Sequence, residues 1–476
     1  MITKREILDI ASATRLNPHI VEKDYALGWA LAGIFAHGEL REDWVFKGGT
    51  CLKKCYFETY RFSEDLDFTL KAPAHLDEAF LKRVFGEISE WIYEQSGLEF
   101  PADSQDFDIY KNPRGNPNCQ GKLSYQGPVS PVSGGRPRIK LDLTADERLV
   151  LPPVRVSIFH PYSDAPDDGI EVLSYAYEEA FAEKVRALAE RARPRDLYDV
   201  INLYRNPETR PSAAVVLDVL RKKCEFKGIG MPKAGDLDDH KGDIEGAWGS
   251  MLAHQLPALP SVGSFWDVLS EFFEWLGGGE PPIIPAAYTM GRGETVIRES
   301  SLVLPLRVSA QSHIEVIRFA ATNRLCVDLD YQHSTRRIEA YSLRRTKEDN
   351  IILHAWSVDK GAHRSYRVDR IQGARITDQT FLPRYAVELT PSGPASIPAT
   401  QRSSGSGGVG GLGTVSRFTP RKPARQTAPG PTFIYQCGIC GKKFRRKKQS
   451  DRLNAHKAPG GFPCSGRTGM LVDTII

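Results

Sequence analysis

Asp65 and Asp67 are the residues of this chain whose type and spacing point most directly to chemistry. They lie in the stretch SEDLDF, where polar and apolar residues alternate, which predicts a strand with both carboxylates on one face. Neighbouring carboxylates repel each other unless a cation lies between them, and oxygen-only ligands suit Mg²⁺. Asp142, on the polar face of a second predicted strand at residues 139–144, is the expected third ligand.

A glycine pair lies upstream of the two aspartates. Gly48, Gly49 and Thr50 follow a short apolar run and precede a sequence that favours a helix. Backbone amides at such a strand-to-helix break can bind a phosphate. Alone, an Asp-x-Asp strand is typical of a solvated sheet face, and a Gly-Gly pair is typical of a turn. Together they favour phosphoryl or nucleotidyl transfer, in which metal ions activate the attacking hydroxyl.

The elements that must position these residues are mixed helices and strands. Residues 20–35 predict a helix that is apolar on most faces, and residues 44–54 predict a strand that breaks at the glycines and continues as a helix. From residue 178 onward, apolar stripes predict a mainly helical region. Between residues 309 and 381, short strand patterns separated by turn-like stretches predict a small β domain.

Four stretches resemble, in order, the conserved blocks of AbiEii-type nucleotidyltransferase toxins, which belong to the DNA-polymerase-β-like superfamily. These stretches are VEKDYALGWAL, VFKGGTCLKKCY, RFSEDLDF and EEAFAEKVRALAERARPRDLYDV. The resemblance implies an α+β fold, with a polymerase-β-like domain followed by a helical part. It also implies a toxin or phage-defence effector that moves a nucleoside monophosphate from a nucleoside triphosphate (NTP) to RNA, with tRNA the expected acceptor, and releases pyrophosphate.

The same resemblance assigns roles to individual residues and implies an antitoxin partner. The expected catalytic set comprises the Mg²⁺ ligands of a two-metal site and three further residues: Asp65, Asp67, Asp142, Lys184, Asp196 and Asp199. The expected nucleotide-binding residues are Gly48, Gly49, Thr50, Arg61 and Ser63. Lys184 lies beside an apolar helix stripe. The alternative to a catalytic role is a lysine that packs its aliphatic part on this stripe and keeps its amine in solvent. Two other functions stay open: nucleotidylation of protein hydroxyls, and nucleic-acid binding by a regulator whose transferase domain is inactive.

Residues 309–381 resemble a WYL domain, an SH3-like β module. The stretches HIEVIRFAATNR, VDLDYQ and RRIEAYSLRRTKEDNIILHAWSVDKGAHRSYRVDRIQGARI carry the resemblance. It implies binding of nucleic acid or a nucleotide ligand by Tyr341, Arg364, Arg367 and Arg370. The triplet that names the family is Ile-Ile-Leu here, at residues 351–353, so its aromatic rings are absent. A charged edge strand is the alternative interpretation of residues 363–370.

Three cysteines and a histidine near the C-terminus have the spacing of a metal site. Cys437, Cys440, His456 and Cys464 supply the four ligands that tetrahedral Zn²⁺ requires. A segment of this size needs a bound metal to stabilise its fold, because it cannot bury a stable core. Its first half resembles a zinc finger with two cysteine and two histidine ligands, with Cys464 in place of the second histidine. A redox Cys-x-x-Cys is the alternative, and the other five cysteines are expected to be reduced.

Positive charge gathers in the same segment. Residues 415–476 hold 13 Lys/Arg and 2 Asp/Glu, a local charge of +11, whereas the other 414 residues carry −7. The six basic residues expected to bind nucleic acid are Lys442, Lys443, Arg445, Arg446, Lys447 and Lys448. Such charge binds phosphate backbones without reading sequence, and a solubilising run is the alternative.

Four segments are therefore predicted. Residues 1–285 form the nucleotidyltransferase domain, 286–390 the WYL-like β domain, 391–431 a linker rich in Gly, Ser and Pro, and 432–476 the zinc-binding module. The chain has no apolar run of about 18 residues and its N-terminal stretch is charged, so we expect a cytoplasmic protein without a membrane partner.

Overall fold

The computed structural model describes residues 1–14, 16–57, 61–130, 135–206, 209–282, 294–297 and 308–389. In the C-terminal part it describes residues 432–441, 443–446, 449, 451–453, 456–457 and 463–475. The chain divides into two compact units, Met1–Ser404 and Gly405–Ile476. The predicted linker, 391–431, lies outside the described residues. Within the described part, no helix is long and apolar enough to cross a membrane.

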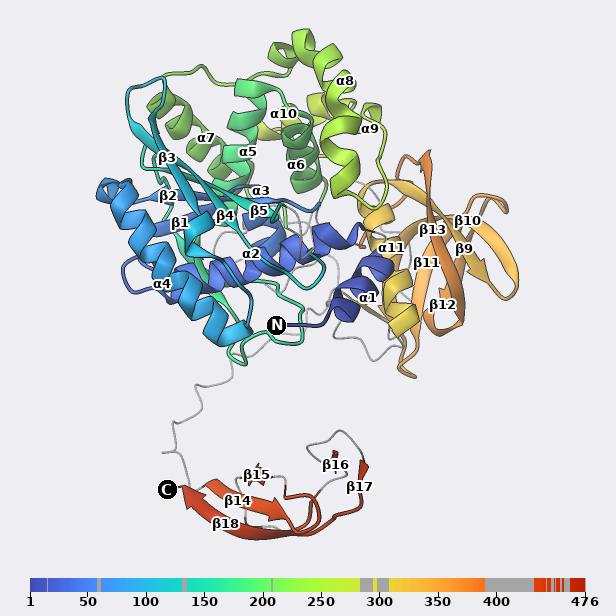
Figure 1. The fold of residues 1–476 in the computed structure, drawn as a ribbon. Helices are drawn as coiled ribbons and strands as arrows, with labels where there is room; N and C mark the ends of the chain where they lie inside the picture. Colours follow the sequence, from blue (N-terminus) through green and yellow to red (C-terminus); the bar gives the residue numbers. More distant parts are fainter. Residues whose placement is uncertain are drawn as a thin grey trace. The chain divides into compact units, whose positions relative to one another are not determined.

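A mixed seven-stranded sheet is the centre of the first part of unit 1 (Figure 1). Its strands, in spatial order, are β3 (Asp106–Lys111), β4 (Pro117–Ser124), β5 (Arg138–Thr144), β2 (Asp65–Leu70), β1 (Trp44–Lys47), β7 (Glu171–Ser174) and β6 (Val154–Ser157). β2 runs parallel to β5 and antiparallel to β1. Leu66 and Phe68 of β2 are fully buried while Asp65 and Asp67 are half-buried, which confirms the predicted alternation.

This part of the chain also contains the helices α1 (Lys4–Thr14), α2 (Pro18–Ala36) and α4 (Glu78–Ser96). α2 is buried along most of its length and contacts α1, α4 and β7, because its apolar residues occupy most of its faces. Asn17 caps it by accepting a hydrogen bond from the His19 amide, and Pro18 occupies its first position. After β1, the chain enters α3 (Gly48–Cys51) and a π-helical turn (Leu52–Tyr56), as predicted for the glycine break.

The helical part that follows the sheet contains α5 (Tyr177–Arg191), α6 (Pro194–Arg205), α7 (Ala213–Lys227), α8 (Lys241–Leu252), α9 (Gly263–Trp266) and α10 (Leu269–Leu276). α5 contacts α6 and α7, and its fully buried Phe181 stacks on Phe272 and Trp275 of α10. Short 3₁₀ turns join several of these elements: Pro73–His75, Ala102–Ser104, Ala234–His240 and Ala253–Gln255.

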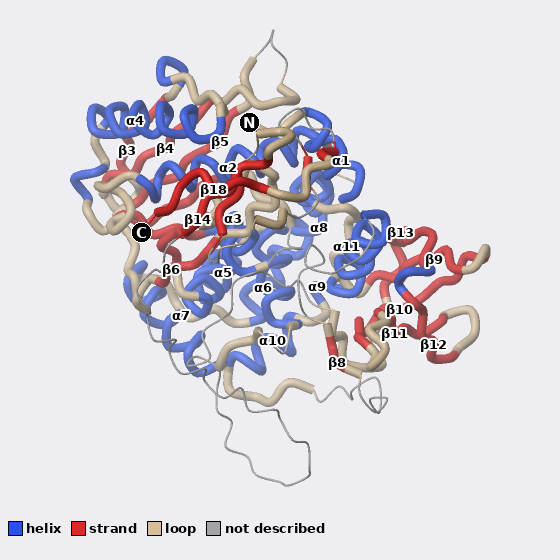
Figure 2. The backbone as a smooth tube through the Cα atoms, turned by 90° about the horizontal axis from the view of Figure 1, so that it is seen from below, coloured by secondary structure: helices blue, strands red, loops and turns tan. Residues whose placement is uncertain are grey.

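A second sheet forms the β-rich part of unit 1. Its strands are β8 (Thr295–Val296), β9 (Leu325–Tyr331), β10 (Ser334–Arg345), β11 (Ile351–Ser357), β12 (Ala362–Arg367) and β13 (Ile371–Thr380). The order is β12-β11-β10-β9-β13, with β8 paired to β10. Helix α11 (Val308–Thr322) packs on β9, β10 and β13 and also contacts α1 (Figure 2). The predicted strand at 363–370 ends at Arg367, because Val368–Arg370 is a 3₁₀ turn.

Unit 2 is built from short strands in its described residues. β14 (Thr432–Cys437) lies between β15 (Lys443–Arg446) and β18 (Gly469–Ile475), and β16 (His456–Lys457) pairs with β17 (Pro463–Cys464). In a finger with two cysteine and two histidine ligands, the histidines lie on a helix. Here His456 lies on a strand, so the module differs from that finger in its fold.

Candidate functional site

Three carboxylates lie on adjacent strands at the centre of the large sheet. The parallel pairing of β2 and β5 places Asp67 directly opposite Asp142, and Asp65 opposite Lys140. Asp142 accepts hydrogen bonds from Gln120 Nε2 (3.2 Å) and Lys140 Nζ (2.8 Å).

Burial makes ionisation of these carboxylates costly. It raises the pKa of Asp67 to about 6, and the charge of Asp142 adds to the rise while Lys47 and Lys184 oppose it. Burial also raises the pKa of Asp65, against the charges of Lys140 and Lys23. A cation placed between these groups would offset both the burial and the mutual repulsion.

The glycine pair lies against the carboxylates and the arginine that precedes them. Gly48 has a φ of +85°, and a Cβ at this position would lie 2.1 Å from Asp67 Oδ2. A Cβ on Gly49 would lie 2.7 Å from Arg61 Nη2 and 3.1 Å from Ser63 Oγ. The structure therefore brings four of the predicted nucleotide-binding residues to the Asp67 side of the sheet. The fifth, Thr50, is buried, and its hydroxyl donates a hydrogen bond to the Asp65 carbonyl oxygen.

Alanine at position 48 tests this close approach. We expect Gly48→Ala to destabilise the protein by roughly 1–3 kcal/mol, because the left-handed backbone is strained by a Cβ and the methyl group must displace Asp67. Gly38→Ala is the matched control: Gly38 is exposed and a Cβ there meets nothing within 4 Å. Thermal unfolding of the three proteins measures the difference. Equal melting temperatures for the two variants would contradict the geometry.

Asp199 is the centre of a buried ion cluster next to the glycine pair. Its Oδ1 accepts a hydrogen bond from Arg61 Nε and its Oδ2 one from Arg61 Nη2, both at 2.7 Å, while Lys184 Nζ lies 2.8 Å from Oδ2. Burial alone would raise the pKa of Asp199, but the two cations hold it well below its usual range. Arg61 also donates to Gln255 Oε1 at 3.0 Å. Asp199 thus fixes the side chains of both Arg61 and Lys184, and the charge of Lys184 acts on Asp67.

Asp196 forms an ion pair with Arg191 of α5. It is buried, but its two oxygens accept hydrogen bonds from Arg191 Nε (2.8 Å) and Nη2 (2.9 Å) rather than from Lys184. Of these two aspartates of the expected catalytic set, Asp199 is therefore the one that contacts Lys184.

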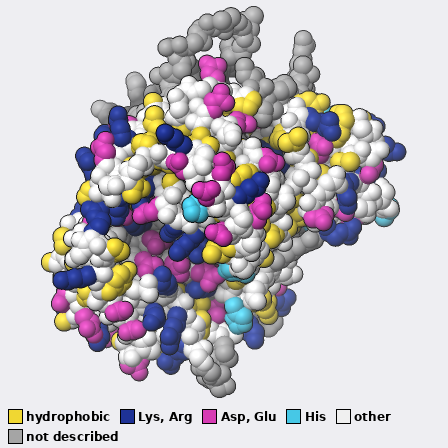
Figure 3. Space-filling view, turned by 90° about the horizontal axis from the view of Figure 1, so that it is seen from above, with side chains coloured by type: hydrophobic (Ala, Val, Ile, Leu, Met, Phe, Trp, Pro, Cys, Tyr) yellow, Lys and Arg dark blue, Asp and Glu magenta, His cyan; other side chains and the backbone are white. Residues whose placement is uncertain are grey.

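Several cations at the site have no counterpart in the sequence prediction. Lys47 lies opposite Asp67 in the β1–β2 pairing. Its position directly before the glycine pair is the sequence feature that could have identified it as a site residue. Lys23, Lys140 and Arg195 act electrostatically on Asp65, and Arg191 is affected by Asp67. Figure 3 shows a face on which Lys and Arg side chains are interspersed with Asp and Glu, with a group of acidic side chains near the middle.

The residues expected to bind a ligand in the β-rich part do not form one surface. Tyr341 is fully buried in the core and donates a hydrogen bond to Glu339 Oε2 at 2.6 Å. Arg364 and Arg367 lie three residues apart on β12 and therefore point to opposite faces of the strand. Arg367 pairs with Asp369 at 2.9 Å, and Arg370 lies beyond the strand.

Three of the four predicted Zn²⁺ ligands of unit 2 lie together. Cys437, Cys440 and Cys464 place their sulfur atoms within 4.8 Å of one another, and Sγ of Cys437 and Cys464 are 3.8 Å apart. The Gly466 amide donates to Cys464 Sγ at 3.3 Å. His456 lies opposite Cys464 in the β16–β17 pairing, so its backbone is placed next to the cluster. The other five cysteines are free and buried, as expected.

The basic residues of unit 2 are only partly described. Lys443 is exposed on β15, and the backbones of Arg445 and Arg446 continue the same strand. Lys442, Lys447 and Lys448 lie outside the described residues.

Comparison with known proteins places the chain among transferases. The family model described as nucleotidyl transferase AbiEii toxin, Type IV TA system, matches residues 29–275, and the model of the WYL domain matches residues 312–376. Among solved structures, MenT4, nucleotidyltransferase toxin Rv2826c from Mycobacterium tuberculosis H37Rv, is similar at 19% identity, with 59% of this chain and 91% of that chain covered and a TM-score of 0.39. No curated protein matches the chain.

Proposed function

Because the chain belongs to the AbiEii family of nucleotidyl transferase toxins, we propose that it transfers a nucleoside monophosphate from an NTP to RNA, with tRNA as the favoured acceptor. The observation that carries this proposal is the juxtaposition of Asp67 and Asp142 across β2 and β5 with Gly48 against Asp67. The family also suggests a cognate antitoxin as a protein partner. A cytoplasmic location fits these substrates.

The carboxylates fit a divalent metal. Asp65, Asp67 and Asp142 offer oxygen ligands only and share one region of the sheet, and the raised pKa values of Asp65 and Asp67 reflect burial and a repulsion between carboxylates that a cation would relieve. When bound there, Mg²⁺ supplies charge neutralisation at the phosphates and a more acidic attacking hydroxyl. Two ions are expected, as in other sites that clamp an in-line displacement.

The chain's own residues position the NTP. The absence of side chains at Gly48 and Gly49 lets the phosphates approach the backbone, next to Arg61 and Ser63. Lys184, fixed by Asp199, supplies a cation on the Asp67 side of the sheet. Asp199 itself is a positioning residue, since both of its oxygens are engaged by Arg61 and Lys184.

Positive charge in unit 2 favours a nucleic acid as the acceptor. Residues 415–476 carry a charge of +11, and the cysteine cluster would fold this segment around Zn²⁺. A protein hydroxyl is the alternative acceptor, because some enzymes of this fold modify proteins. If the acceptor is RNA, the affinity of the chain for it should weaken steeply as the salt concentration rises. A protein acceptor does not require such a salt dependence.

A labelling experiment tests the proposal. Each of the four NTPs, labelled at the α-phosphate, is incubated with the full chain, Mg²⁺ and either total tRNA or cell protein. We expect label on the RNA with wild type and none with the Asp65→Ala/Asp67→Ala double variant. Label on protein alone would replace the RNA acceptor by a protein one. Absence of transfer, or equal transfer by the double variant, would leave the binding function of an inactive transferase as the better explanation.

The metal content of unit 2 gives an independent prediction. We expect about one Zn²⁺ per full-length chain, and Cys437→Ser should remove most of it, because a site with three remaining ligands holds the ion far more weakly. Elemental analysis of purified protein measures the ratio, and RNA affinity should fall in the same variant.

Cys119→Ala is the matched control, since Cys119 is a buried free cysteine of the large sheet and lies outside unit 2. Its zinc content should equal that of wild type. Zinc that persists in Cys437→Ser would show that the cluster is not the binding site.

A further inference from the structure

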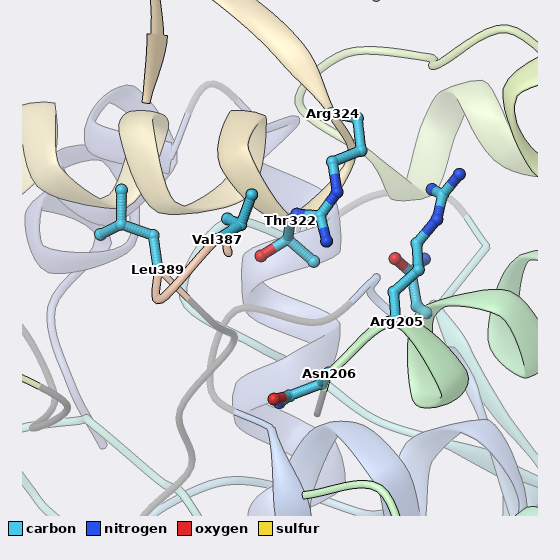
Figure 4. A pocket seen from close by; sticks show the side chains of 7 residues that line it. Arg205, Asn206, Thr322, Arg324, Val387 and Leu389 are labelled. Atoms are coloured by element: carbon cyan, nitrogen blue, oxygen red, sulfur yellow. The ribbon is translucent and has the colours of Figure 1, made fainter. Parts of the chain in front are cut away.

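A pocket lies within unit 1 where the end of α6 meets the end of α11 and the segment after β13 (Figure 4). It is a small depression that opens to solvent. The residues that line it are Asn202, Arg205, Asn206, Thr322, Arg324, Val387 and Leu389. The pocket thus joins residues from the matched nucleotidyltransferase region and from the matched WYL region.

Two arginines bring positive charge to this pocket, and the guanidinium of Arg205 lies over the Phe265 ring and within the electrostatic influence of Glu271. In the described part of the chain, neither Arg205 nor Arg324 forms an ion pair with a carboxylate within 4.0 Å. Arg324 Nη1 donates to the Ala321 carbonyl oxygen at 2.7 Å, and Arg205 donates to the Ser264 carbonyl oxygen. Burial lowers the pKa of Arg205 to about 10, and burial together with the charge of Arg205 lowers the pKa of Arg324 to about 9. Both guanidinium groups remain protonated at neutral pH and repel each other.

Other polar atoms of the lining also lack partners among the described residues. Arg205 Nη1, Thr322 Oγ1 and Asn202 Oδ1 are buried without a hydrogen bond. Asn202 is 4% exposed and Thr322 is 9% exposed. A buried polar atom left without a partner costs roughly 1–3 kcal/mol, so several such atoms around one space indicate a missing polar ligand.

We propose that this pocket binds a small phosphate-type oxyanion, either a free ion or the phosphate of a mononucleotide. The two guanidinium groups and the Thr322 hydroxyl offer donors to its oxygens, and arginine is the side chain best suited to planar, two-pronged binding of phosphate. Asn202 donates its amide nitrogen to the Tyr198 carbonyl oxygen at 3.1 Å, which leaves Oδ1 to accept from a protonated phosphate oxygen.

The anion would also connect the two matched regions. Asn202 and Arg205 lie on α6, the helix that carries Asp199 three residues before Asn202. Thr322 ends α11, the helix that packs on the second sheet. Occupancy of the pocket therefore stabilises the junction of α6 and α11, one helical turn from the residue that fixes Arg61 and Lys184. The binding event itself does not depend on the proposed transfer reaction.

Binding is tested on the full-length chain without added divalent metal, at constant ionic strength. Inorganic phosphate, pyrophosphate and AMP are titrated separately, with chloride as the ionic-strength control, and melting temperature and calorimetric affinity are measured. We expect at least one of the three anions to raise the melting temperature of wild type. Tightest binding of inorganic phosphate or pyrophosphate would indicate a free ion, and tightest binding of AMP would indicate the phosphate of a mononucleotide. Arg324→Gln should weaken that anion roughly tenfold or more, and Thr322→Val roughly threefold.

Arg221→Gln is the matched control, because Arg221 is an exposed arginine of α7 that takes no part in the lining. It should leave the affinity unchanged. The proposal is overturned if none of the anions binds, or if Arg324→Gln and Thr322→Val bind as tightly as wild type, since the anion would then occupy another site. Thr322→Val keeps the shape of the side chain, so it decides the question even if Arg324→Gln fails to fold.

Discussion

Asp67→Asn is expected to reduce nucleotide transfer at least about 1,000-fold, a loss of roughly 4 kcal/mol in transition-state stabilisation, without lowering the melting temperature. The loss follows from the removal of a proposed metal ligand opposite Asp142. The unchanged or higher melting temperature follows from the removal of a buried charge that repels Asp142 and Asp65 in the metal-free protein. Steady-state transfer rates and thermal unfolding without Mg²⁺ measure the two effects.

A loss of transfer without a loss of stability distinguishes a functional carboxylate from a structural one. Asp108→Asn on β3 is the matched control, because Asp108 is an exposed aspartate of the same sheet. It should change transfer less than about twofold and stability by less than about 0.5 kcal/mol. Retention of activity in Asp67→Asn would remove Asp67 from the proposed metal site.

Asp199→Asn is expected to lower the free energy of unfolding by roughly 3–5 kcal/mol. Asparagine keeps the shape of the side chain but removes the negative charge that two buried cations share, Arg61 and Lys184. Transfer should also fall, mainly through a higher KM for the NTP, because both cations lose the group that fixes them. Chemical denaturation measures the stability, and KM and kcat are compared with those of wild type.

Asp196→Asn is the control on the same helix. Asp196 is paired only with Arg191, which is 46% exposed and can be solvated when the pair is broken. A loss of about 1 kcal/mol is therefore expected. Equal losses for the two variants would show that Asp199 does not hold a buried cluster.

The Asp199 cluster also predicts the response of stability to acid. Because the pKa of Asp199 is held below its ordinary value in the folded chain, its ionised form stabilises the fold. That contribution is present above the ordinary carboxyl pKa and is lost as the pH falls toward the folded value. The stability of Asp199→Asn should therefore change less than that of wild type below about pH 4. An identical acid profile for both proteins would contradict this linkage.

Local patterns in the sequence were sufficient to predict the elements that carry the site. The alternation around Asp65 and Asp67 predicted β2 and the shared face, and the Gly48-Gly49 break predicted the change from strand to helix. These features depend on the period of two residues in a strand and on the conformational freedom of glycine, which are properties of neighbouring residues. The spacing of Cys437, Cys440 and Cys464 is local in the same sense and predicted their cluster.

Pairings between distant residues were decided only by the tertiary structure. Arg61 and Asp199 are 138 residues apart, and Asp196 and Asp199 look equivalent in sequence although only Asp199 reaches Lys184. Tyr341 has the residue type of a ligand contact but lies in the core.

The sequence by itself thus determined the family, the strand that bears the carboxylates and the glycine break, because short-range periodicity and residue type suffice for these. The strand register that places Asp142 beside Asp67, the ion cluster at Asp199 and the pocket between Arg205 and Arg324 arise from packing of elements far apart in the chain. Packing depends on the shapes and charges of all the elements at once, so no local pattern encodes it.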